Sequence, residues 1–215
     1  MAGRFVRERD MRQSAATTRE QIIIAADQLF YAGSIAGVSM ERIAERAGVT
    51  KKALYYHFRS KDDLLAAYLK ARAVKVRERY RRWAGTEGSV AQRMERMFAN
   101  VAVAASEPRW RGCGFTRVVC ELADLPGHPA AIVARLHKRT FEAWLCSMLV
   151  EEGRRDAAEL ARILMLLLDG SVVQTLTHRD PAYARAAGLA ARLLLCSAGA
   201  AGANASSVRL IAACA

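Results

Sequence analysis

Apolar residues recur at three- and four-residue spacing along most of the chain. The first such stretch begins at Thr18, and its apolar face consists of Ile22, Ala25, Ala26, Leu29 and Phe30. This spacing places apolar side chains on one side of an α-helix. Alternating runs of Val, Ile and Thr, which would predict strands, are few. The pattern therefore predicts an all-α protein.

Two short helical segments with a turn between them come next. The first runs from Ser39 to about Ala47, and Gly48 can adopt the positive φ that ends a helix. Thr50 can then cap the amides of the following segment. Two short helices joined by such a turn predict a helix-turn-helix at about residues 40–59, whose second helix enters a major groove.

The second of these helices carries the side chains that would meet DNA. Leu54 and Phe58 are four residues apart and are expected to anchor the helix in the core. This arrangement turns the following residues largely outward: Lys51, Lys52, Tyr55, Tyr56 and His57. The alternative is an ordinary pair of packed helices, because any αα-hairpin can show the same spacing.

Charge favours the DNA-binding interpretation. The chain has a formal net charge of +12, and residues 1–85 hold 18 Lys and Arg against 9 Asp and Glu. Residues 86–215 hold 15 against 12. A basic excess on the segment that carries the motif is the electrostatic footprint expected for phosphate contact.

The last two helical segments, residues 157–177 and 182–196, are apolar nearly all round. A helix of this kind must be covered on two sides, and the second cover is most simply another copy of the chain. We therefore predict a homodimer. Its interface is expected to contain Leu160, Leu164, Leu167, Leu168, Leu189, Leu193 and Leu194.

Other classes of protein find little support. The five cysteines are widely spaced and include no C-x-x-C pair, and the four histidines have no metal-ligand spacing. Phosphate-loop, Rossmann and G-x-S-x-G motifs are absent from the sequence. Uninterrupted runs of 18 apolar residues and a secretory signal are also absent. We expect no metal, no cofactor, no membrane span and a reducing cytoplasm.

Three spaced elements occur in register between Thr18 and Leu69. They are Ile22-Ile23-x-Ala25-Ala26-x-x-Leu29-Phe30, Ile43-Ala44-x-x-Ala47-Gly48-Val49-Thr50 and Leu54-Tyr55-Tyr56-His57-Phe58-x-Ser60-Lys61-x-x-Leu64. Together they resemble the DNA-binding domain of TetR-family transcriptional regulators. One departure is that Ser34 stands where the family usually has glycine, with Gly33 before it.

The resemblance implies a homodimeric bacterial cytoplasmic regulator with a three-helix head. It places Thr50, Lys51 and Lys52 near bases. The resemblance also implies that four further side chains lie near phosphates or groove walls: Tyr55, Tyr56, His57 and Lys61. We expect a flexible basic arm (1–16), a DNA-binding domain (17–77), a ligand-binding and dimerisation domain (78–197) and a flexible tail (198–215).

A pocket for a small effector is expected in the second half of the chain. The apolar candidates to line it are Met94, Met97, Phe98, Trp110, Phe115, Phe141, Trp144, Met148 and Met165. The alternative for each is that it fills the core. Glu121 and Gln174 are polar candidates, because a buried polar side chain without an internal partner invites a ligand group.

Three functions follow from these observations. The favoured one is a repressor released from a palindromic operator by a small hydrophobic effector. The second is a sequence-independent nucleic-acid-binding protein that uses the same basic head. The third is a helical enzyme acting on hydrophobic metabolites with Cys113 or His128, and it is the weakest because no nucleophile, base and orienting group are spaced together.

Overall fold

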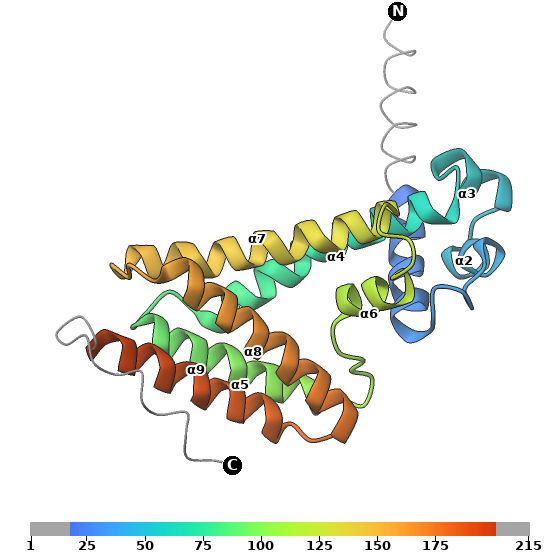
Figure 1. Cartoon of the computed structure of the whole chain (residues 1–215). Helices are drawn as coiled ribbons and strands as arrows, with labels where there is room; N and C mark the ends of the chain where they lie inside the picture. The colour runs from blue at the N-terminus through green and yellow to red at the C-terminus, as the bar shows by residue number, and fades with distance from the viewer. Residues whose placement is uncertain (1–17, 201–215) are drawn as a thin grey trace, which may run out of the picture. The chain divides into compact units, whose positions relative to one another are not determined.

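The computed structural model describes residues 18–200, with side chains up to Ser197, and this part of the chain is helical without strands (Figure 1). The arm at 1–16 and most of the tail at 198–215 lie outside it. The first helix covers residues 18–32. It is followed by α2 (Met40–Ala47), α3 (Lys51–His57), α4 (Lys61–Ala84), α5 (Val90–Ala105), α6 (Gly114–Glu121), α7 (Pro129–Glu151), α8 (Ala157–His178) and α9 (Ala182–Ala200). The prediction of an all-α protein is confirmed.

The turn between α2 and α3 has the predicted chemistry. Gly48 adopts φ 68° at the end of α2, and its N–H donates to the carbonyl oxygens of that helix. Thr50 Oγ1 then accepts the N–H of Ala53 at 3.1 Å, which caps α3. Ser39 caps α2 in the same way by accepting the N–H of Arg42 at 3.2 Å. These local interactions fix where each of the two helices begins and ends.

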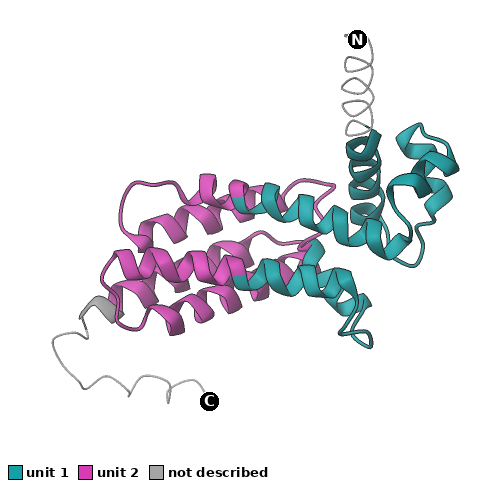
Figure 2. Ribbon diagram, turned by 90° about the horizontal axis from the view of Figure 1, so that it is seen from above, with its two compact units in different colours: residues 1–77, 114–139 teal, residues 78–113, 140–215 magenta. Residues whose placement is uncertain are grey.

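The chain divides into two compact units (Figure 2). The first unit contains the described residues 18–77 together with 114–139, and the second contains 78–113 and 140–200. Residues 114–139 lie within the range expected for the ligand-binding and dimerisation domain (78–197), and they group with the first unit.

Hydrogen bonds from α6 explain why this segment belongs to the first unit. The guanidinium of Arg117 donates to the carbonyl oxygens of Tyr31 at 2.9 Å and Gly33 at 2.7 Å. Glu121 accepts the backbone N–H of Ile35 at 2.7 Å. Arg117 and Glu121 of α6 therefore supply hydrogen bonds to backbone carbonyl and N–H groups at the end of the first helix and in the loop after it. The last carbonyl groups of any helix lack partners within that helix.

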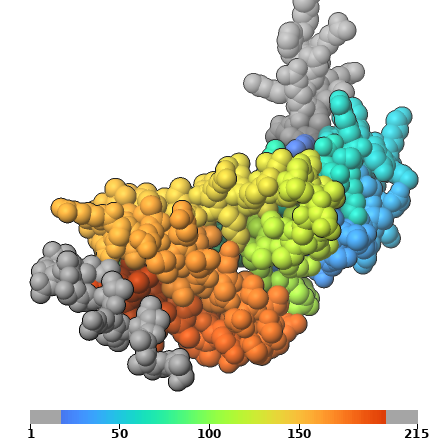
Figure 3. Space-filling model, viewed as in Figure 1, coloured from blue at the N-terminus to red at the C-terminus, as the bar shows by residue number. Residues whose placement is uncertain are grey.

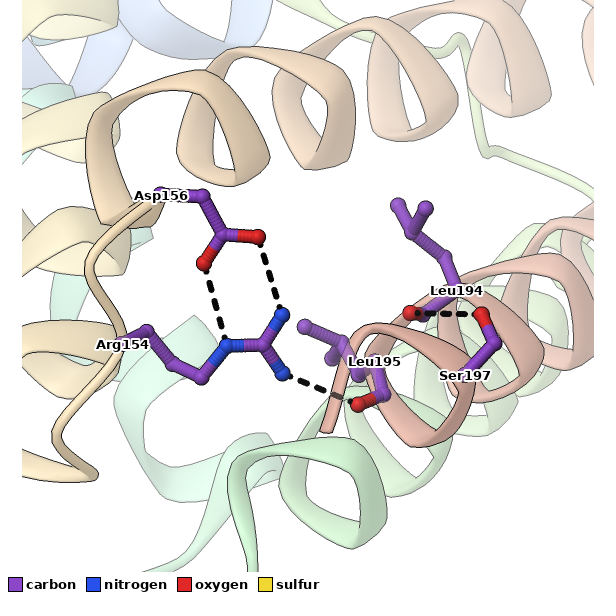
Figure 4. Close-up of polar contacts among 5 residues, drawn as sticks. All are labelled: Arg154, Asp156, Leu194, Leu195 and Ser197. Atoms are coloured by element: carbon purple, nitrogen blue, oxygen red, sulfur yellow. Dashed lines mark hydrogen bonds and ion pairs between the residues drawn. The ribbon is translucent and has the colours of Figure 1, made fainter. Parts of the chain in front are cut away.

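The second unit is built on α5, α8 and α9, which pack against one another. Its core includes the fully buried side chains of Met94, Phe98 and Leu145. The loop between α7 and α8 is tied to the end of α9, since Arg154 pairs with Asp156 at 3.1 Å and donates to the carbonyl oxygen of Leu195 at 3.0 Å (Figure 4).

A glycine sets the closest approach of α9 to α5. A Cβ atom added to Gly188 would lie 2.8 Å from Cβ of Phe98, which is the stem of the side chain and cannot rotate away. Gly188→Ala is therefore expected to lower the free energy of unfolding by about 1–3 kcal/mol. Urea denaturation at fixed protein concentration measures this change.

Ala186→Gly, at an exposed position of the same helix, is the control for helix propensity. This substitution should lower the free energy of unfolding by about 1 kcal/mol. If Gly188→Ala instead raised the free energy of unfolding by about 1 kcal/mol, the higher helix propensity of alanine would explain the result. The expected overlap with Phe98 would then be wrong.

Candidate nucleic-acid interface

The recognition helix α3 presents the predicted side chains to solvent. Leu54 is fully buried and Phe58 is 3% exposed, so these two residues anchor the helix as expected. Lys51 and Lys52 are exposed, Tyr56 is 83% exposed and Tyr55 is 42% exposed, while His57 is partly buried beside Tyr56. The helix therefore has one face held in the core and one basic, aromatic face free to contact a ligand.

Lys51 is held in place by an acidic residue that the sequence analysis did not single out. Its Nζ lies 2.5 Å from Oε1 of Glu41, in the first turn of α2, and 5.9 Å from the ring centre of Tyr55. The hydrogen bond lowers the pKa of Glu41 and raises the pKa of Lys51. Both side chains are therefore charged at neutral pH, and they form an ion pair on the exposed surface of the helix-turn-helix.

Lys61 contacts the backbone of its own chain and is also partly exposed to solvent. It begins α4 and is partly buried, and its Nζ lies 3.5 Å from the carbonyl oxygen of Ala36. An ammonium group has three donors, so this contact leaves the others available. Lys61 therefore links the start of α4 to the loop before α2.

A basic groove lies next to the recognition helix. It has a volume of about 560 Å³, and Arg19 lies 5.0 Å from the ring centre of Phe58 at its wall. Its lining combines charged groups with an apolar floor and consists of Arg19, Ile23, His57, Phe58, Arg59, Asp63, Ala66, Ala67, Lys70, Ala71 and Pro129. Only His57 was expected at a site. The lining comes from three separate stretches of the chain, residues 19–23, residues 57–71 and Pro129, and periodicity alone could not show that these stretches meet.

The apolar pocket candidates lie in the interior instead. Met94, Met97, Phe98, Phe141, Met148 and Met165 are buried in the core of the second unit, with Trp110 and Trp144 partly buried against it. Phe115 belongs to the first unit, where its ring stacks on His137 at 3.8 Å between ring centres. Burial is the main reason that the pKa of His137 falls to about 4, so this ring is neutral at physiological pH.

The two polar pocket candidates are both exposed. Glu121 is exposed and accepts the N–H of Ile35, and Gln174 is exposed on α8. Neither side chain is a buried polar group that needs a ligand to satisfy it. The partner of Glu121 lies 86 residues away in sequence, which a local pattern does not reveal.

The leucines proposed for the dimer interface divide into two groups. Leu160, Leu164 and Leu168 are 3%, 0% and 5% exposed and pack in the core of the chain itself. They follow one another at four-residue spacing and thus form one inward-facing stripe of α8. Leu167 and Leu194 are partly buried against this core.

An apolar surface remains on α8 and α9. Leu189 is 55% and Leu193 is 61% exposed on α9, and on α8 Leu166 is 68% and Val173 is 46% exposed. Figure 3 shows α8, in orange, at the visible surface of the molecule. By length and composition alone, α8 could also cross a membrane, but a single helix of this kind within the described residues is weak evidence for a membrane span, and 44% of its most apolar stretch is buried inside the structure.

Within residues 18–200 there is no group of three or more His, Cys, Asp or Glu side chains that could hold a metal ion. The site is thus a helix-turn-helix with an exposed basic and aromatic recognition helix. This fold and this surface define a helix-turn-helix DNA-binding protein.

Comparison with known proteins also indicates a DNA-binding regulator. Residues 22–68 match the family model of bacterial regulatory proteins of the tetR family. The HTH-type transcriptional regulator TtgR of Pseudomonas putida is 44% identical over 61 residues, which are 28% of this chain and 29% of TtgR. The chain thus spans less than a third of the length of this curated relative.

Solved structures match over most of the chain. A TetR-family transcriptional regulator from Streptomyces coelicolor has a TM-score of 0.73 and 27% identity, over 84% of this chain and 94% of that one. A candidate TetR-type regulator from Streptomyces avermitilis has a TM-score of 0.65 and 31% identity, over 85% and 94%. The chain belongs to the TetR family of transcriptional regulators. Its relatives are regulators and not enzymes, so the enzyme hypothesis is set aside.

Proposed function

We propose that this regulator is a cytoplasmic homodimeric repressor that binds a palindromic operator and is released by a small hydrophobic effector. The observation that carries the proposal is the exposed basic and aromatic face of α3, held on the core by Leu54 and Phe58. Its first turn contains Lys51 and Lys52, which suit base edges in the major groove. Tyr55, Tyr56, His57 and Lys61 supply contacts to phosphates and groove walls.

The proposed dimer supports operator binding. A soluble monomer rarely exposes a large apolar patch, and Leu166, Leu189 and Leu193 are all more than half exposed. A twofold axis lets α8 and α9 of two copies cover one another with the same surface. Two recognition helices related by this axis match half-sites separated by about 34–36 Å or a multiple of it, so the operator is an inverted repeat.

The proposed effector site is the methionine- and aromatic-rich interior of the second unit. Met94, Met97 and Met148 are flexible side chains that can repack around an apolar molecule. An effector that binds one arrangement of this core more tightly shifts the dimer toward that arrangement. Release from the operator follows if the favoured arrangement separates the two heads by a spacing that no longer fits the half-sites.

Selection of bound fragments from random DNA, followed by fluorescence anisotropy on the selected site, tests this function. If the dimer neutralises about 6–10 phosphates, the slope of log affinity against log salt should be about −0.9 for each contact. The selected site should be an inverted repeat bound at least about 1000-fold more tightly than its scrambled control. A steep salt response without a preferred sequence would instead identify a sequence-independent nucleic-acid binder.

A further inference from the structure

The pair formed by Glu41 and Lys51 stands on the surface proposed to read DNA. Glu41 belongs to α2 and Lys51 to the first turn of α3, so the ion pair bridges the two helices of the motif. Their side chains are 58% and 61% exposed. The ammonium of Lys51 therefore has a defined position before DNA arrives, and a carboxylate lies directly beside it.

A carboxylate in this position works against non-specific DNA binding. It repels phosphates, and it occupies one donor of a lysine that could otherwise contact them. An exposed ion pair also adds little to the stability of the fold. Glu41 also suits the first turn of α2, where the helix dipole favours an acidic residue, but that role does not require the contact with Lys51. The ion pair itself therefore points to recognition of a particular base pair.

The chemistry of the pair matches one base pair well. In the major groove a G·C pair presents guanine N7 and O6 as neighbouring acceptors and the cytosine N4 amino group as a donor. O6 and N4 are hydrogen-bonded to one another, about 2.9 Å apart. The ammonium of Lys51 donates and the carboxylate of Glu41 accepts, with their N and O atoms 2.5 Å apart. An A·T pair in its place would put the adenine N6 amino group beside the ammonium and thymine O4 beside the carboxylate, so donor would face donor and acceptor would face acceptor.

We propose that Glu41 is a specificity-determining residue, which together with Lys51 reads one G·C pair in each half-site. Lys51 donates to guanine N7 and O6, while Glu41 accepts from cytosine N4 and holds the ammonium in place. This inference rests on the proposed function, in which α3 enters the major groove of an operator.

The test compares two variants of the full-length protein that lose the same charge from α2. Glu41→Gln removes the acceptor carboxylate, whereas Glu45→Gln changes another exposed glutamate of the same helix. Anisotropy is measured on the selected operator and on a panel of operators, each with one symmetric base-pair change, together with random DNA. Circular dichroism confirms that both variants are folded.

In the Glu41→Gln variant, discrimination at one symmetric G·C position should fall about tenfold, with other positions unchanged. Affinity for random DNA should rise, because Lys51 becomes free to contact phosphates. The Glu45→Gln variant should keep the full preference at every position. This pattern of loss at one position cannot arise from a general change in charge.

Two results would overturn the inference while leaving the proposed function intact. One is full discrimination at every operator position in Glu41→Gln, and the other is an equal loss of affinity for all DNA. If the wild-type protein selected no sequence at all, the proposed function would fail first, and this inference would fail with it.

Discussion

Replacing both Lys51 and Lys52 with alanine is expected to abolish operator binding while the protein remains folded. Both side chains are exposed in the first turn of α3, and neither takes part in the core that Leu54 anchors. Each dimer would lose four base-contacting lysines. Because one good base contact contributes about 1–3 kcal/mol of discrimination, affinity should fall by about 1000-fold or more, to the level of non-specific DNA.

Lys75→Ala provides the matched control, since Lys75 is an exposed lysine of α4 away from the recognition helix. This variant should keep the operator affinity of the wild type apart from a small general effect of charge. Electrophoretic mobility shift and anisotropy measure binding, and thermal melting should give unchanged midpoints for both variants. Undiminished operator affinity in the double variant would refute the assignment of α3 as the recognition helix.

The features that the sequence predicted well depend on neighbours close in the chain. The caps at Ser39 and Thr50 and the left-handed Gly48 involve residues within five positions, so their spacing is visible in the sequence. Leu54 and Phe58 fall on one helical face for the same reason, and both are buried. The helix-turn-helix could therefore be located and oriented before the structure was known.

The features that were missed depend on tertiary partners. Glu121 is a polar residue among apolar ones and is therefore a candidate to line a pocket. Its carboxylate instead accepts the backbone N–H of Ile35, which lies in a loop 86 positions earlier. The pairing of Glu41 with Lys51 needs the geometry of the turn between two helices, which spacing does not supply. The same limit applies to residues 114–139, which join the first unit through contacts of Arg117 with the end of the first helix.

The interface leucines show a different limit. α8 is apolar on nearly every side, so its sequence has no polar face from which the buried direction can be read. The leucines at 160, 164 and 168 proved to be core residues, while Leu166 on the same helix is 68% exposed. Only packing against α5 and α9 decides which stripe of α8 is covered by the chain and which stays exposed.

The exposed stripe leads to the second large expected effect. Glutamate at both Leu189 and Leu193 should convert the dimer to a monomer and abolish tight operator binding. These side chains are 55% and 61% exposed in one chain, so the substitution should leave the subunit fold intact. In the dimer, however, each carboxylate would be buried against an apolar partner surface, at a cost of several kcal/mol. Dimer affinity should therefore weaken by about 1000-fold or more.

Val103→Glu is the control, because Val103 is 67% exposed on α5, outside the proposed interface. It should leave both the dimer and operator binding unchanged. Light scattering at micromolar concentration gives the oligomeric state, and anisotropy gives the affinity for one half-site and for the full operator. A monomer retains one recognition helix and the weak affinity of one half-site, because the second half-site must then be bound by a separate molecule. A wild-type monomer that bound the full operator tightly would show that α8 and α9 do not form the proposed interface.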